Sequence, residues 1–206
     1  YQRSVPRAAT RGLSALIAGS AVALLSCEAV AGALCSPGYP ATVALGDTCP
    51  IINNAGTQPT ITIDGTLTGT MGLNNTGTIT TFTNNGTTSA VNTGAGNVTA
   101  IGVANYFVLT SIVNSATGTI SASATTTGGG GRTATGDGIR AESDIGSITN
   151  SGTISGDATG AGANLFGRGI ASNGVGIGSI TNNAGATITG ATYGIFLSQE
   201  GRRSER

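Results

Sequence analysis

One motif recurs in this chain and constrains its fold more than any other feature. GSITNSGTISG, which starts at Gly146, returns as GSITNNAGATITG, which starts at Gly178. Repetition at a spacing of roughly 20 to 50 residues is typical of folds in which each repeat buries its apolar residues against its neighbours. We therefore expect a fold built by stacking similar units.

The surrounding sequence repeats a related pattern, in which Asn is followed within a few residues by Gly and then by a Thr/Ile segment. Asn and Gly close tight turns, and Thr-Ile-Thr alternates with the period of a β-strand. The leading asparagines are unevenly spaced along the chain: Asn53, Asn74, Asn84, Asn114, Asn150 and Asn182. Uneven spacing favours a solenoid with variable loops over a propeller. Rungs of about 20 to 25 residues, rising about 4.8 Å each, predict six or seven rungs over residues 51–198 and a rod of about 30 Å.

Composition supports an all-β fold and excludes some functions. Charged residues make up 9% and aromatic residues 4% of the chain, and there are 35 glycines. An ordinary globular core is not expected from this composition, and the many Thr, Ile and Val residues are atypical of disorder. The net charge is zero, and no charged residue lies between Asp64 and Arg132. Without a basic stripe we expect no nucleic-acid partner.

Residues 1–33 have the pattern of a secretory signal peptide. Basic residues precede an apolar run from Leu13 to Leu25, and small residues follow with candidate cleavage sites at Ala31 and Ala33. The run is too short for a permanent membrane span of about 20 residues. We predict a signal helix that is removed on export. An alternative is a lipobox ending at Cys27, which would then carry the lipid.

Two cysteines follow the predicted cleavage sites. Cys35 and Cys49 would close a loop of about 15 residues in an oxidising compartment, so we predict a disulfide. Residues 34–50 are then a small stapled cap, residues 51–198 the repeat region, and residues 199–206 a charged tail. Within the repeats, the apolar segment 98–113 predicts a pair of buried strands, and residues 125–131 predict a flexible glycine-rich loop.

A second repeated segment precedes each copy of the motif. Gly136-Asp137-Gly138-Ile139 corresponds to Gly167-Arg168-Gly169-Ile170, and Tyr193-Gly194-Ile195 begins a third occurrence. The signal sequence, the Cys pair, GSITNSGTISG, GSITNNAGATITG and YGIF together resemble the passenger region of Gram-negative autotransporters. The resemblance implies a right-handed parallel β-helix at the cell surface or released from it, and a C-terminal translocator barrel. The 206 residues have no room for that barrel, so we expect a truncated passenger.

The sequence predicts no catalytic, metal or cofactor site. The chain has no histidine, which excludes a Ser/His/Asp triad and the usual zinc sites. The one acidic cluster is Asp137, Glu142 and Asp144, with Arg140 among them, and solvated turns explain it better than glycoside hydrolysis. GDGIRA at 136–141 fits G-x-G-x-x-A but has neither the strand before it nor the helix after it that a dinucleotide site needs. A calcium nonapeptide at the glycine-rich loop would need Asp where Thr133 stands.

These observations predict a non-enzymatic, exported β-solenoid that acts in surface display, adhesion or autoaggregation. Its partners would be host or bacterial cell-surface molecules, further copies of itself, and the secretion and outer-membrane assembly machinery. One alternative is that an enzymatic domain lies beyond residue 206. Another is an ice-binding or purely structural solenoid, because Thr-x-Thr strands are abundant. Ice binding needs evenly spaced Thr, and the uneven repeat spacing argues against it.

Overall fold

The computed structural model describes residues 42–161 and 163–198, and within these ranges every regular element is a β-strand. These ranges contain eighteen strands, which form three parallel sheets of six. Sheet A contains β1 (Thr42–Val43), β4 (Thr57–Ile63), β7 (Thr78–Asn84), β10 (Leu109–Asn114), β13 (Ile145–Asn150) and β16 (Ile177–Asn182). Sheet B contains β2 (Thr48–Cys49), β5 (Thr66–Gly69), β8 (Thr87–Gly94), β11 (Thr119–Thr126), β14 (Thr153–Thr159) and β17 (Thr187–Gly190). Sheet C contains β3 (Ile52–Asn54), β6 (Met71–Asn75), β9 (Val98–Asn105), β12 (Thr133–Ala141), β15 (Asn164–Asn173) and β18 (Tyr193–Ser198).

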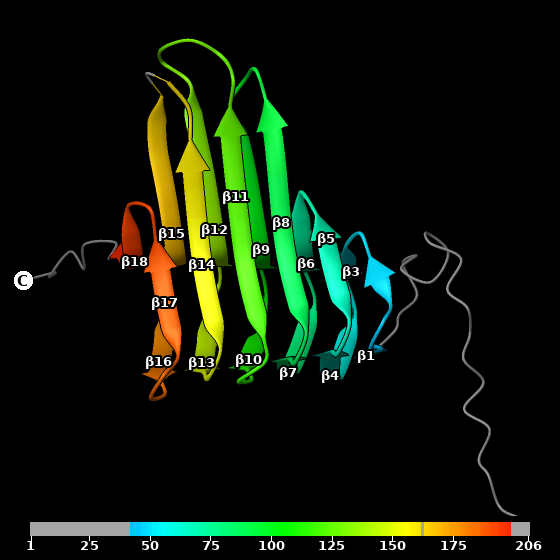
Figure 1. The fold of residues 1–206 in the computed structure, drawn as a ribbon. Helices are drawn as coiled ribbons and strands as arrows, with labels where there is room; N and C mark the ends of the chain where they lie inside the picture. Colours follow the sequence, from blue (N-terminus) through cyan, green and yellow to red (C-terminus); the bar gives the residue numbers. More distant parts are fainter. Residues whose placement is uncertain (1–41, 162, 199–206) are drawn as a thin grey trace, which may run out of the picture.

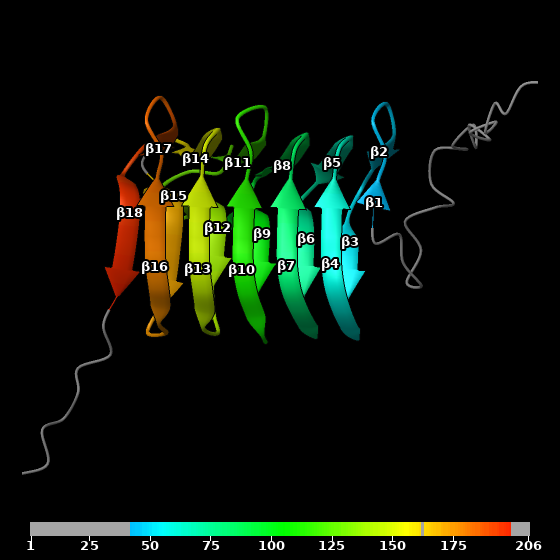
Figure 2. The ribbon, with the colours of Figure 1, turned by 90° about the horizontal axis from the view of Figure 1, so that it is seen from below.

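Each strand pairs with the strand three positions later in the chain, so three consecutive strands make one rung of a parallel β-solenoid (Figures 1 and 2). The predicted all-β parallel β-helix is therefore confirmed, with six rungs in the described ranges. The predicted pair of strands in 98–113 is also confirmed, as β9 and β10. The first rung begins at Thr42, so the sheets extend into residues 34–50, the segment assigned to the cap.

Most rungs in the second half of the chain are longer than the predicted rungs of about 20 to 25 residues. Paired asparagines of successive rungs lie 21 residues apart at first and later 30, 36 and 32 apart. Much of the added length lies in sheets B and C: β8 and β11 have 8 residues and β14 has 7, whereas β5 and β17 have 4. Figure 1 shows these long strands and their partners in sheet C projecting beyond the neighbouring rungs.

The core has two parts that correspond to this change in rung size. The main core runs along the solenoid and consists mostly of Ile, Leu and Val, with Phe82 fully buried. A second cluster lies where the long strands of sheets B and C extend: Ala90, Val98, Ala100, Ala122, Ala124, Ala134 and Ala158. Alanine is small, so the facing sheets can pack closely there. Alternating burial along β11 shows the period of two expected for a strand with one face inward.

Two ladders of asparagine stabilise the corners of the solenoid. Asn54, Asn75 and Asn105 end strands of sheet C, whereas Asn84, Asn114, Asn150 and Asn182 end strands of sheet A. In each ladder one amide donates to the next across 2.8 Å, and every member except the exposed Asn182 is buried. The first ladder ends at Asn54, whose buried Oδ1 has no hydrogen-bond partner among the described residues. Asn74 lies at a corner that follows sheet C, and Asn84 lies at a corner that follows sheet A. The short stretch of sequence between them therefore connects two different corners and is not a rung length.

A column of glycines runs along sheet C at a point of close backbone approach. The column consists of Gly72, Gly102, Gly138, Gly169 and Gly194, each followed by Leu, Val or Ile. A Cβ on Gly138 would lie 2.6 Å from the carbonyl oxygen of Gly169 and 2.7 Å from that of Ser155. No larger residue fits without moving the neighbouring rung. The repeated Gly-Ile pair noted in the sequence corresponds to the last three glycines of this column.

Several predicted features lie outside the described residues. They are the signal peptide 1–33 with its sites at Ala31 and Ala33, the alternative lipid site Cys27, Cys35 of the predicted disulfide, and the tail 199–206. In the part of the chain that is described, no helix is long and apolar enough to cross a bilayer.

Candidate functional site

The outward face of sheet B carries two neighbouring columns of hydroxyl side chains. Strand register places Thr48, Thr66, Thr87, Thr119, Thr153 and Thr187 in one column, so every rung contributes a threonine. The second column lies two residues further along each strand and consists of Thr68, Ser89, Ser121, Ser155 and Thr189. All of these side chains are half-buried or exposed, whereas the residues between them are mostly buried. The array is therefore a continuous surface on successive rungs.

Hydrogen bonds between rungs help to fix the orientation of some of these hydroxyls. Ser121 Oγ donates to Ser89 Oγ at 3.2 Å, and the hydroxyls of Thr125 and Thr159 lie 2.9 Å apart. Thr125 and Thr159 belong to a shorter column with Thr93, present only in the long rungs. Threonine is β-branched and has few χ1 rotamers in a strand, so the array loses little side-chain entropy when it orders.

Sheet A has a similar but less regular outward face. One column consists of Thr42, Thr62, Thr83, Val113, Thr149 and Thr181, and its neighbour of Thr60, Thr81, Ser111, Ser147 and Ser179. Val113 interrupts the first column, and serine replaces threonine from the fourth rung onward in the second. Both sheets thus present hydroxyls in register, but sheet B alone has an unbroken column of threonine.

Charged side chains are almost absent from these two hydroxyl faces. Among the residues of the sheet B strands, the only charged one is Asp157, which lies outside the two main columns. The sheet A strands contain no charged residue. In the described part of the chain, the ionic groups instead gather on sheet C and in the turns.

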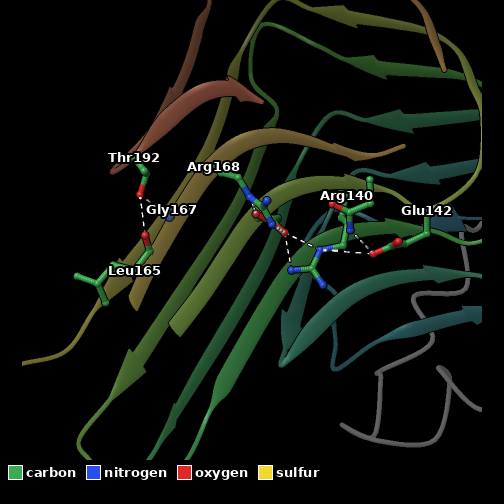
Figure 3. A network of polar contacts seen from close by, with 8 residues as sticks. Arg140, Glu142, Leu165, Gly167, Arg168 and Thr192 are labelled. Carbon is green, nitrogen blue, oxygen red and sulfur yellow. Dashed lines mark hydrogen bonds and ion pairs between the residues drawn. The ribbon is translucent and has the colours of Figure 1, made fainter. Parts of the chain in front are cut away.

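The main ionic network lies on sheet C around Asp137, which has no exposed surface. Register places Arg168 beside it on the next rung. Arg168 Nε is 2.7 Å from Asp137 Oδ1, and its Nη2 is 2.9 Å from Oδ2. Arg140 Nε also donates to Oδ2, at 2.5 Å. Figure 3 shows the two arginines converging from neighbouring strands. A forked guanidinium–carboxylate pair fixes geometry as well as charge, so this network ties β12 to β15.

Aromatic rings flank Arg168 in this network. The guanidinium carbon of Arg168 lies 5.9 Å from the ring centre of Phe166 and 5.3 Å from that of Phe196. Tyr193 packs against Phe196 with ring centres 5.3 Å apart. Cation–π contacts of this kind stabilise a desolvated arginine. Beside them, Gly167 N–H donates to Thr192 Oγ1 at 3.1 Å, and that hydroxyl donates to the Leu165 carbonyl (Figure 3).

The structure places the acidic cluster noted in the sequence in several separate interactions. Asp137 is occupied by the two arginines, Glu142 accepts from Asn173 at 2.7 Å and lies 4.0 Å from Arg140, and Asp144 accepts from Gly176 N–H at 2.7 Å. Each carboxylate thus supports local structure. Among the described residues, no group of three or more Cys, Asp or Glu is arranged to hold a metal ion.

The other motifs singled out in the sequence lie in the solenoid framework. GDGIRA at 136–141 lies wholly within β12, and its Gly138 belongs to the glycine column. Residues Gly128–Gly131 lie in the turn between β11 and β12, with Gly131 at a positive φ of 80°. Cys49 is disulfide-bonded. Its pairing with Cys35 stays a prediction, because Cys35 lies outside the described residues.

Sequence reasoning missed two features that alignment of the repeats could have revealed. Aligning the Gly-Asp-Gly and Gly-Arg-Gly segments of the sequence matches Asp137 with Arg168. If equivalent residues of adjacent rungs are neighbours, this match places an acid beside a base. Likewise, aligning the segments that follow each turn, TLT, TTS, TIS, TIS and TIT, produces the threonine column of sheet B.

Comparison with family models, with curated proteins and with solved structures finds no match. The fold and its surfaces define the class directly: a parallel β-solenoid with two hydroxyl faces that carry almost no charge and one ionic, aromatic face.

Proposed function

We propose that this chain is the exported passenger region of an autotransporter and that it acts without catalysis in surface display and adhesion. In addition to the observed solenoid, we propose that the coil is right-handed, that a signal helix precedes it, and that a disulfide staples an N-terminal cap. The proposal rests on the sequence resemblance, and the parallel β-solenoid is consistent with it. Its partners at the cell surface are cell-surface molecules or further copies of the chain. During export through the periplasm, its partners are the secretion and outer-membrane assembly machinery.

The observation that supports an adhesive role best is the continuity of the hydroxyl columns. Sheets A and B repeat outward hydroxyl groups on successive rungs, interrupted in sheet A by Val113, with no charge in the sheet A strands. A single hydroxyl contact contributes little, on the order of 1 kcal/mol. Identical contacts that engage together along a rigid rod add avidity without any new kind of contact. Such a surface suits a repetitive partner better than a small molecule.

Adhesion can be tested by displaying the chain on a bacterial surface through a fused translocator barrel. Cells that carry the chain are expected to bind host cells or to aggregate more than cells that carry the barrel alone. Deleting residues 51–198 is expected to abolish that gain. Unchanged adhesion after the deletion would remove the proposal.

A further inference from the structure

The outward face of sheet B has the regularity that a crystalline ligand requires. Threonine occupies the same place on all six rungs, and Thr or Ser occupies the neighbouring place on five. We propose that this two-column array is an ice-binding surface, whose ligand is the ordered water lattice of ice.

The two repeat distances of the array follow from strand geometry. Adjacent parallel strands lie about 4.8 Å apart, and residues i and i+2 of a strand lie about 6.7 Å apart. Six threonines in one column therefore span about 24 Å. These nearly perpendicular repeats place the hydroxyl groups on a regular two-dimensional grid, as the water molecules of an ice face are. A rigid set of hydroxyl and methyl groups at such spacings can hold water in positions that match the crystal.

The uneven repeat lengths of the sequence do not disturb this surface. Thr66 pairs with Thr87, Thr87 with Thr119, and Thr119 with Thr153, although the connecting stretches of chain differ in length. The additional residues run through the far ends of the long strands, the glycine-rich turn after β11, and the turns between sheets C and A. Uneven repeat lengths along the chain therefore do not exclude ice binding, because the threonines still pair in register on successive rungs.

The side chains present favour ice over other repetitive ligands. The two columns carry no aromatic ring on which a sugar could stack and no charge to attract an ionic polymer. In the described part of the chain, the exposed aromatic residues lie elsewhere, at Tyr106, Phe107, Phe166 and Tyr193.

The inference rests on the proposed function in one respect, since it assigns a ligand to part of the same hydroxyl surface. Two assays distinguish the two ideas. Cell adhesion is measured above the freezing point, where ice is absent, and ice binding is measured with purified protein and no cells. Loss of one activity leaves the other measurable.

The test uses the purified full chain and slowly grown ice. We expect the wild-type protein to be incorporated into the ice and to show thermal hysteresis. The double variant Thr119→Tyr, Thr153→Tyr places two large rings on the array and is expected to be excluded from ice like an inert control protein. Tyrosine is well tolerated in strands, and circular dichroism checks that the variant is folded.

A matched control places the same side chain on another face. Thr99 is exposed on β9 of sheet C, and we expect Thr99→Tyr to enter ice as the wild type does. The proposal is overturned if the wild-type chain is excluded from ice, or if the double variant and the Thr99 variant behave alike. Binding of the wild type to an insoluble polysaccharide but not to ice would also overturn it.

Discussion

Replacing Asn114 by alanine is expected to lower the free energy of unfolding by about 3 kcal/mol, at about 1 kcal/mol for each lost hydrogen bond. The side chain is fully buried within the ladder of sheet A. Its Oδ1 accepts one hydrogen from Asn84 at 2.8 Å. Its two amide hydrogens are shared among Asn150 Oδ1 at 2.8 Å and the carbonyls of Gly118 and Thr153 at 3.1 Å. Alanine removes all of these bonds and leaves buried polar atoms of two rungs without their partners.

Equilibrium unfolding in urea, followed by far-ultraviolet circular dichroism, measures the change. The matched control is Asn183→Ala, because Asn183 is exposed and its amide makes a 2.7 Å bond to Ser151 Oγ at the surface. Its cost is expected to stay within about 0.5 kcal/mol, as for most surface substitutions. A difference of less than about 0.5 kcal/mol in unfolding free energy between the two variants would contradict a stabilising role for the asparagine ladder.

Three further predictions concern other parts of the framework. Gly138→Ala is expected to cost at least about 2 kcal/mol through overpacking at the glycine column of sheet C, whereas Gly129→Ala, with open space around its Cβ, should be nearly neutral in the same urea titration. Asp137→Asn is expected to cost about 3 kcal/mol, because it leaves two arginines beside a neutral partner; an unfolding midpoint equal to that of the wild type would contradict this. Cys49→Ser is expected to cost about 3 kcal/mol by the loop-entropy estimate for a loop of about 15 residues, and peptide mapping without reductant checks the predicted pairing with Cys35.

The fold class could be predicted because turn chemistry and strand period agree along the chain. Asn-Gly turns followed by Thr-Ile alternation specify short strands with one apolar face, and repetition of the motif specifies stacking. The GSITN copies at 146–150 and 178–182 lie in β13 and β16, which pair in register. Local signals of this kind need no knowledge of distant contacts.

Rung length could not be predicted well from the same signals. Asn74 and Asn84 look alike in sequence, yet they belong to different sheets of the solenoid. Treating them as successive rungs mixes two sheets and shortens the apparent repeat. The long strands β8, β11 and β14 add further length through Ala and Ser positions, whose burial depends on the facing strands of sheet C.

The ionic network on sheet C could be predicted only with knowledge of how the strands pair in three dimensions. In the sequence, Asp137 resembles part of a charged turn with Glu142 and Asp144, where each carboxylate would be solvated. Its full burial is possible because Arg140 on its own strand and Arg168 on the next both bind it. Only correct stacking of the Gly-Asp-Gly and Gly-Arg-Gly segments brings these groups together.

The hydroxyl columns of sheet B exist only if its strands pair in the register described above. Engineered cysteines at Ser121 and Ser155 test it, because these residues pair across adjacent rungs and neighbouring parallel strands lie about 4.8 Å apart, within disulfide reach. We predict rapid cross-linking of Ser121→Cys with Ser155→Cys under mild oxidation, and none of Ser121→Cys with Thr159→Cys. Preferential formation of the second cross-link would show that the columns are out of register, which would contradict both the hydroxyl surface and the ligand assigned to it.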